Sequence, residues 1–147
     1  MAIWKSIEMG KLYMGKARFG SDLLEEITDL CRTEGVSTGW VKGLGAVQKA
    51  KIGYYGQSDR QYKIITLDRG MEITHLVGNI TLKEGDPMVH AHVSLADSDG
   101  LTYGGHLVSG TIVFACEFIV QAFEGPIFER GFDQETGLPL WTMAEEY

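Results

Sequence analysis

The stretch "PMVHAHVSLADSDGLTYGGHLVSG", from Pro87 to Gly110, predicts two β-strands joined by a tight turn. Successive side chains of a strand point to opposite faces, so His90 and His92 share one face. The two histidines point away from a core face, towards solvent, a cleft or a partner chain. That core face carries only apolar side chains: Val89, Ala91, Val93 and Leu95.

The turn sequence "DSDG" (Asp97–Gly100) favours a type I turn followed by a glycine in the left-handed region. This loop pairs Asp97 with Leu101. Counting back along both strands then places His92 opposite His106, with His90 diagonal to it. The turn chemistry therefore favours a register that gathers all three imidazoles on one face.

Two other geometries would give a different result. A two-residue loop would place His106 opposite Ala91, on the core face, and a bulge at Gly104 or Gly105 would also break the register. The same two glycines would otherwise leave space beside His106.

Three imidazoles on neighbouring strands suit a metal ion. Cross-strand neighbours have Cβ atoms about 4.5–5.5 Å apart, and such side chains can converge on one ion at about 2.0–2.1 Å from each nitrogen. We therefore predict a zinc site formed by His90, His92 and His106. Three protein ligands leave a fourth position open, as in a catalytic or ligand-accepting zinc site. The alternative is three hydrogen-bonding histidines without a metal.

Other polar residues have weaker claims to the site. Asp97 and Glu117 are candidates for an acid, a base or an outer partner of the metal ligands, and Asp99 is a third. Both aspartates are also typical turn formers. Glu117 is a lone carboxylate in an apolar strand and needs a partner, so its role can be structural. His75 shares a predicted strand face with apolar residues and is interpreted as a core or interface histidine.

Outside this hairpin the sequence predicts one principal helix, about residues 22–34. Asp22 is a good N-cap, Glu25 completes a capping box, and Gly35 supplies a stop. The apolar face of the helix comprises Leu23, Leu24, Ile27, Leu30 and Cys31. The remaining segments predict strands near 11–18, 39–43, 46–55, 62–67, 71–82, 88–95, 101–108 and 111–123.

These elements predict an α+β fold with a mainly antiparallel sheet in a single domain, residues 1–147. The segment "KGLGAV", at 42–47, has glycines in the manner of a phosphate loop. It lacks the lysine of that loop, and no helix follows it. A bulge or tight bend is the interpretation that fits.

The strand Thr111–Phe123 is apolar on both faces apart from Glu117 and Gln121. One face is expected to carry Ile112, Phe114, Cys116, Phe118 and Val120, and the other Val113, Ala115 and Ile119. One helix cannot cover both faces, so the spare face predicts a subunit interface with Glu117 paired by a polar group. The alternative is a sheet that curls and covers itself.

Composition limits the function. The chain has 147 residues and a formal net charge of −7, and its Lys and Arg residues are scattered. Binding through DNA phosphates needs a basic face, so non-specific DNA binding by the isolated chain is disfavoured. No apolar run is long enough to span a bilayer. Cys31 and Cys116 lie far apart without a CxxC spacing, which favours reduced thiols and a cytoplasmic location.

The combination of "GSDLLEEI", "KGLGAV", "MEITHLVGNI", "HAHVSLADSDG" and "YGGHLVSG" resembles the PPC (plants and prokaryotes conserved) domain family, also called DUF296. The resemblance covers about residues 8–125 and leaves 126–147 as a C-terminal extension. It implies a homotrimer, and in prokaryotic relatives a zinc site that falls here on His90, His92 and His106. Bacterial and archaeal members are often labelled DNA-binding, by analogy with a PD1-like motif.

The chain departs from the plant members of this family in two ways. It has no Arg-Gly-Arg-Pro core of an AT-hook, the element that grips DNA in those proteins. Their partner-binding Gly-Arg-Phe-Glu-Ile-Leu segment survives only as "RGMEIT", which keeps Glu72 and Ile73. The expected function is therefore a zinc-binding homotrimer, acting as a small-ligand sensor or a hydrolytic or lyase-type metalloenzyme. The alternatives are a DNA-binding or transcription-regulatory module and a protein-interaction module.

Overall fold

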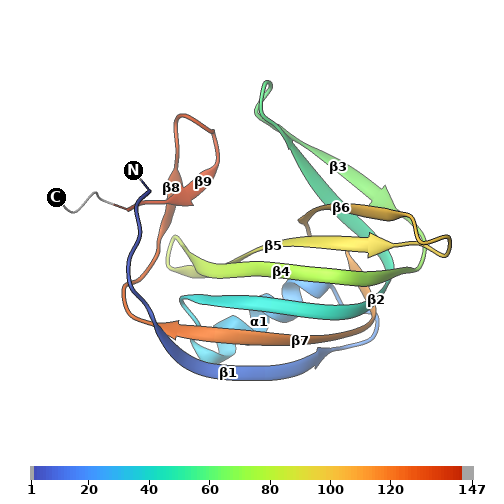
Figure 1. Cartoon of the computed structure of the whole chain (residues 1–147), viewed down its shortest axis with the longest axis horizontal. Coiled ribbons are helices and arrows are strands. Elements are labelled where there is room, and N and C mark those ends of the chain that lie inside the picture. The colour runs from blue at the N-terminus through green and yellow to red at the C-terminus, as the bar shows by residue number, and fades with distance from the viewer. Residues whose placement is uncertain (1, 144–147) are drawn as a thin grey trace.

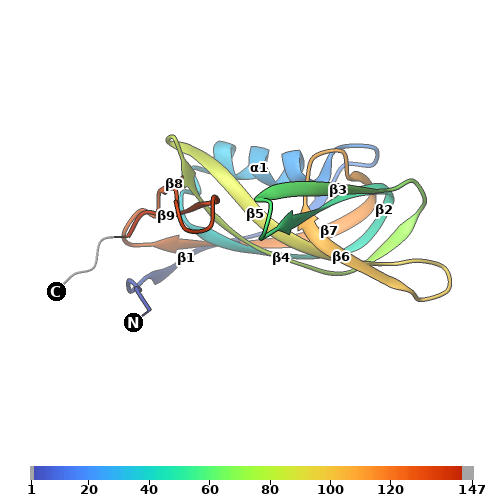
Figure 2. The same ribbon diagram turned by 90° about the horizontal axis from the view of Figure 1, so that it is seen from above.

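A curved, mostly antiparallel sheet of seven strands forms the body of the molecule, with one helix against one face (Figures 1 and 2). The computed structural model describes residues 2–143. The elements are β1 (Glu8–Ala17), α1 (Leu23–Glu34), β2 (Gly39–Gly56), β3 (Gln61–Leu67), β4 (Met71–Lys83), β5 (Asp86–Ala96), β6 (Thr102–Leu107), β7 (Ile112–Glu124), β8 (Arg130–Phe132) and β9 (Pro139–Trp141). The predicted α+β class with a single principal helix is confirmed.

Helix α1 begins after Asp22 and ends at Gly35, as predicted. One carboxylate oxygen of Asp22 accepts hydrogen bonds from N–H groups of the first turn, and Gly35 has a φ of 66°. The other oxygen accepts from Ser109 and from the N–H of Gly110. Within the described residues the carboxylate of Glu25 accepts no hydrogen bond from the N–H of Asp22, so only the Asp22 half of the predicted capping box forms. No helix in residues 2–143 has the length and apolar character needed to cross a membrane.

The predicted strands 39–43 and 46–55 are one long strand, β2. Its register with β4 shifts between Gly43 and Gly45, and Gly45 has a φ of 141°, which an L side chain rarely adopts. The predicted bulge in 42–47 is therefore confirmed. Beyond it β2 leaves β7 and β4 to pair with β3, and Gly53 meets His106 of β6. The bend thus lets the sheet curl until β6 returns to β2.

The core lies between α1 and the sheet. It combines the buried face of the helix with apolar side chains from all the central strands. Its largest fully buried members are Leu23, Ile27, Val41, Val47, Ile52, Leu76, Ile80, Val93, Leu95, Leu107, Val113 and Val120.

Two further bulges, one in β4 and one in β7, place side chains on the opposite face from the one that strict alternation along the strand predicts. In β4, Thr74 is the extra residue between the pairs formed by Ile73 and His75. The side chain of His75 is therefore exposed, so of the two predicted positions, core or interface, the core is wrong. In β7, the register with β2 shifts so that Phe114 is the extra residue. Phe114 is therefore exposed and Val113 is buried, the reverse of the predicted faces.

No helix of residues 2–143 covers the face of the sheet opposite α1, which we call the helix-free face (Figure 2). One row of register partners crosses it from strand β1 to strand β6: Met14, Ile119, Lys42, Val77, His92 and His106. At the β1 end of the row Met14 is 80% exposed and Ile119 39%. Nearby Leu12 and Leu44 are each 59% exposed. Although the sheet curls, it does not cover these apolar side chains, which are exposed in the single chain.

The C-terminal segment adds a small hairpin, β8–β9, which the sequence analysis did not predict. It stands beside the open end of the main sheet in Figure 1. Arg130 attaches it to β4, because its guanidinium donates to the hydroxyl of Thr81 and to the amide oxygen of Asn79. Asn79 is the register partner of His90, so the hairpin reaches the neighbourhood of the three histidines.

Candidate metal centre

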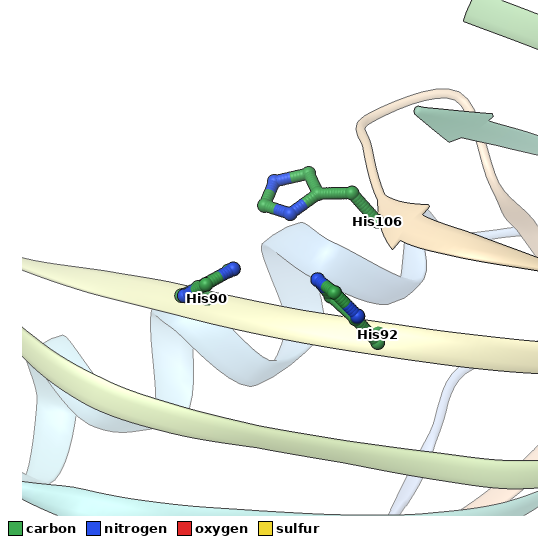
Figure 3. Close-up of side chains that lie close together, drawn as sticks. All are labelled: His90, His92 and His106. Carbon is green, nitrogen blue, oxygen red and sulfur yellow. The ribbon is translucent and has the colours of Figure 1, made fainter. Parts of the chain in front are cut away.

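His90 and His92 on β5 and His106 at the end of β6 point towards one another (Figure 3). The ring centroids are 5.3 Å apart for His90 and His92, 4.9 Å for His90 and His106, and 5.7 Å for His92 and His106. Each ring offers one nitrogen, and these three atoms all lie within 4.8 Å of one another. The predicted gathering of the three imidazoles is present.

The turn between β5 and β6 sets this arrangement. The N–H of Asp97 donates to the carbonyl of Leu101 at 3.0 Å, and Gly100 has a φ of 79°. His92 is then paired with His106, as the turn chemistry predicted. Gly105 does not break the register. A Cβ there would lie 2.7 Å from the carbonyl oxygen of Gly53, so glycine lets β6 approach β2 closely.

The distances suit a tetrahedral ion after small side-chain rotations. Zinc bonded at 2.0–2.1 Å to two imidazole nitrogens in tetrahedral geometry holds those nitrogens about 3.3 Å apart. The observed upper limit of 4.8 Å between ligand atoms leaves at most about 1.5 Å to close. Rotation about the side-chain bonds of a histidine covers that difference without moving the strands.

The electrostatic surroundings favour neutral imidazoles. Burial, with the nearby His106, Arg130 and His92, lowers the pKa of His90 to about 4. Burial, His92 and Arg130 also lower the pKa of His106. A neutral imidazole has a free lone pair, which is the form that binds a metal.

The three histidines lack other partners. Within residues 2–143 none of their ring nitrogens takes part in a hydrogen bond or an ion pair, although His90 and His106 are half-buried. Buried polar nitrogens usually have a partner, which can be a protein group, a water molecule or an ion. The alternative of three hydrogen-bonding histidines therefore finds no support in the described chain.

Space for a ligand lies beside the cluster. A hollow of about 400 Å³ between α1 and the outer edge of β5 has His106 in its wall, with Lys83, Asp86 and Ser109 among its polar lining residues. On the other side the ring of Tyr62, from the β2–β3 hairpin, lies 5.6 Å from the ring of His106. A group bound to an ion at the three histidines would have room to extend.

The predicted acidic partners do not join the cluster. Asp97 lies five residues beyond His92 at the turn. Its carboxylate accepts from the N–H groups of Asp99 and Leu101 and from Arg69. Glu117 is exposed on β7, which β2 and β4 separate from β5. Asp97 thus stabilises the turn, and neither carboxylate contacts a histidine in the single chain.

Two neighbours of the cluster were missed. Asn79 lies directly opposite His90, and Arg130 donates to Asn79 at 2.6 Å. Pairing of β4 with β5 could have identified Asn79, had the bulge at Thr74 been foreseen. For Arg130 the sequence offers no periodic pattern, because it belongs to a three-residue strand in a turn-rich segment.

Comparison with known proteins supports the fold and finds a metal-containing relative. The model of the Plants and Prokaryotes Conserved (PCC) domain matches residues 5–124. A metal-containing protein from Archaeoglobus fulgidus is 38% identical with a TM-score of 0.91, covering 97% of this chain and 100% of that one. A plant- and prokaryote-conserved protein from Pyrococcus horikoshii is 36% identical with a TM-score of 0.90, covering 99% and 100%.

Other relatives carry names that mention no metal. A protein from Ralstonia eutropha JMP134, provisionally named as DNA-binding, is 28% identical with a TM-score of 0.80 over 90% of this chain and 91% of that one. Among curated proteins the chain is 30% identical to the bifunctional protein GlmU of two Synechococcus strains, over 86% and 70% of its length. It spans only 19% and 16% of those two proteins.

Proposed function

Since the chain belongs to the Plants and Prokaryotes Conserved domain family, we propose that it is a metal-binding member in which His90, His92 and His106 hold one zinc ion. The observation that carries this proposal is the convergence of three imidazoles whose ligand atoms lie within 4.8 Å of one another. The metal-containing relative from Archaeoglobus fulgidus supports it. Three histidines with a fourth position open form a ligand set found in catalytic zinc sites.

Three protein ligands leave one coordination position for water or an outside ligand. Zinc at such a position polarises a bound group and makes bound water acidic. The site is therefore that of a small-ligand sensor or of a hydrolytic or lyase-type metalloenzyme. The chain's own part is to orient the three imidazoles through the β5–β6 hairpin and to keep those of His90 and His106 neutral by burial, which lowers the pKa of each.

Metal analysis tests the proposal on protein purified without a nickel column. We expect one zinc per chain in the native protein and far less in the His92→Ala and His106→Ala variants. His75→Ala is the matched control, because His75 is exposed on β4 and lies outside the cluster. Zinc well below one per chain, with none taken up on addition, would contradict the proposal. An anomalous scan at the zinc edge on crystals would identify the ion and its ligands together.

We also propose that the chain forms a homotrimer. The exposed apolar residues of the helix-free face support association, because burying each such side chain is worth about 1.5–3 kcal/mol. Ile119, Met14 and Leu44 lie in this area. The resemblance to the family selects three subunits. A cytoplasmic location is proposed as well, in keeping with Cys31 and Cys116, which are both buried and unpaired.

The alternative function is DNA binding, which the name of the Ralstonia relative favours. Against it stands the net charge of −7, since DNA phosphates demand a basic surface. A mobility shift of duplex DNA that weakens with salt would support this alternative, and the acidic chain is expected to give none. A role as a protein-interaction module remains the third candidate, tested by whether a pull-down with the full chain recovers a stoichiometric partner.

A further inference from the structure

Arg130 is a buried cation whose partners are all neutral. The residue is 7% exposed. Its guanidinium donates to the hydroxyl of Thr81 at 2.8 Å, to the carbonyl of Pro139 at 2.9 Å and to the amide oxygen of Asn79 at 2.6 Å. It also lies 5.8 Å from the centroid of the Trp141 ring. Among the described residues no carboxylate forms an ion pair with it.

Such an arrangement is unusual, because a buried charge is normally paired with an opposite charge. An arginine has five N–H donors, and the three hydrogen bonds above use three of them. Two N–H groups therefore have no acceptor within residues 2–143. The hairpin β8–β9 could be held to β4 by neutral side chains, so the retained charge calls for another explanation.

The charge lies beside the three histidines. Asn79, which accepts from Arg130, is the cross-strand partner of His90, and such partners have Cβ atoms about 4.5–5.5 Å apart. Arg130 therefore lies one hydrogen bond beyond the residue that faces His90 across the strand pair.

We propose that the open side of the metal centre takes a small oxyanion, the carboxylate or phosphate group of a small-molecule ligand, and that Arg130 supplies part of its binding energy. The inference rests on the proposed metal site. A divalent ion on three neutral imidazoles carries two positive charges, and Arg130 adds a third that no carboxylate of residues 2–143 pairs with. An oxyanion offsets this charge, can bond to the ion, and suits the N–H geometry of a guanidinium.

The expected size of the effect follows from Coulomb's law. A unit charge about 7–12 Å away, in a medium of effective dielectric constant about 20, changes the Kd of a monoanion by roughly ten- to fifty-fold. Arg130→Gln should therefore weaken oxyanion binding by about that factor. Arg130→Lys keeps the charge and should retain most of the affinity. Arg69→Gln is the matched control, since Arg69 is an exposed arginine paired with Asp97 at the turn.

The experiment uses the full chain loaded with cobalt(II), whose visible spectrum reports ligands at the metal. Metal content is measured first in each variant, so that loss of the metal is separated from loss of the anion. The chain is then titrated with acetate, phosphate and acetamide, the last being a neutral isostere of acetate. We expect saturable spectral changes with an oxyanion, little with acetamide, and a ten- to fifty-fold weaker response in Arg130→Gln. The stronger of acetate and phosphate identifies the group.

Three outcomes would overturn the inference. One is an equal response to acetate and acetamide in the native chain, which needs no variant. Another is an unchanged oxyanion Kd in an Arg130→Gln variant that holds its full metal content. The third is a native chain that takes up no metal, which defeats the proposed function and this inference with it. If Arg130→Gln fails to fold, the comparison of acetate with acetamide decides.

Discussion

Replacing His92 by alanine isolates the contribution of a metal to stability. His92 is exposed, whereas His90 and His106 are half-buried. Loss of an exposed side chain with no hydrogen bond should alter the stability of the metal-free protein by no more than about 0.5 kcal/mol. Any larger difference between the variant and the native chain in the presence of zinc therefore comes from the metal site.

The magnitude follows from linkage. Zinc at a hundred times its Kd stabilises the folded chain by roughly 2.7 kcal/mol. In a domain of this size 1 kcal/mol shifts Tm by about 2–4 °C, so the native protein should gain about 5–11 °C. Loss of one of three ligands weakens zinc binding by at least about a hundredfold, leaving a shift of roughly 1–2 °C in His92→Ala.

Thermal unfolding with added zinc and with excess chelator measures both shifts. The His75→Ala variant should behave as the native protein does, because His75 shares the exposure of His92 but lies outside the cluster. The reasoning fails if His92→Ala keeps the full zinc-dependent shift. It also fails if the native chain shows none, or if His75→Ala loses it.

Three other perturbations test separate parts of the structure. Ile119→Asp should split the proposed trimer in sedimentation equilibrium, while Ile127→Asp, at an exposed position beyond the end of β7, should not. A folded Ile119→Asp variant of unchanged mass would refute the interface. The stability of the metal-free protein should fall progressively from pH 6.5 to pH 4. In this range the unfolded chain binds a proton at His90 more tightly than the folded chain does, because the His90 pKa in the folded chain is about 4. Chemical denaturation across this range would show a flat profile if the imidazole were not buried. Gly78→Ala should lower the free energy of unfolding by about 1–3 kcal/mol, because the new Cβ would lie 2.5 Å from the carbonyl oxygen of His90. Gly104→Ala should lower it far less in the same assay, because the nearest atom to its Cβ would be 3.4 Å away.

Local sequence was enough to predict the hairpin that forms the site. The turn at 97–100 fixed the register through the conformation of Gly100 and the side chain of Asp97, and both act within a few residues. The helix caps Asp22 and Gly35 are equally local. The bulge at Gly45 could be predicted because glycine is the residue that a positive φ favours.

Long-range features could not be predicted in the same way. The bulges at Thr74 and Phe114 insert one residue into a strand without a glycine to mark them, and each reverses the face of a neighbouring side chain. They come from the pairing of strands across the sheet, which no local pattern records. The contact of Arg130 with Asn79 joins residues 51 apart in sequence, so only the folded chain brings them together.

Trimer formation and zinc binding, both proposed for the helix-free face, can be tested separately. Ile119 and His92 belong to the same row of register partners, but β2 and β4 lie between their strands. Three strand spacings of about 4.8 Å place them about 14 Å apart, and substitutions at that distance usually have additive effects. We therefore expect the Ile119→Asp variant to bind zinc at the native stoichiometry even when it is monomeric, as metal analysis of the monomer fraction would show.

A folded Ile119→Asp monomer without zinc would contradict this expectation in an informative way. Within the described residues Ile119 is separated from His92 by Lys42 and Val77, and a change of one exposed side chain should leave the sheet backbone in place. Loss of the metal on dissociation would then mean that a neighbouring subunit supplies a ligand or holds a histidine in position. Retention of the metal would mean that the β5–β6 hairpin alone provides the site, as the local turn chemistry at 97–100 implies.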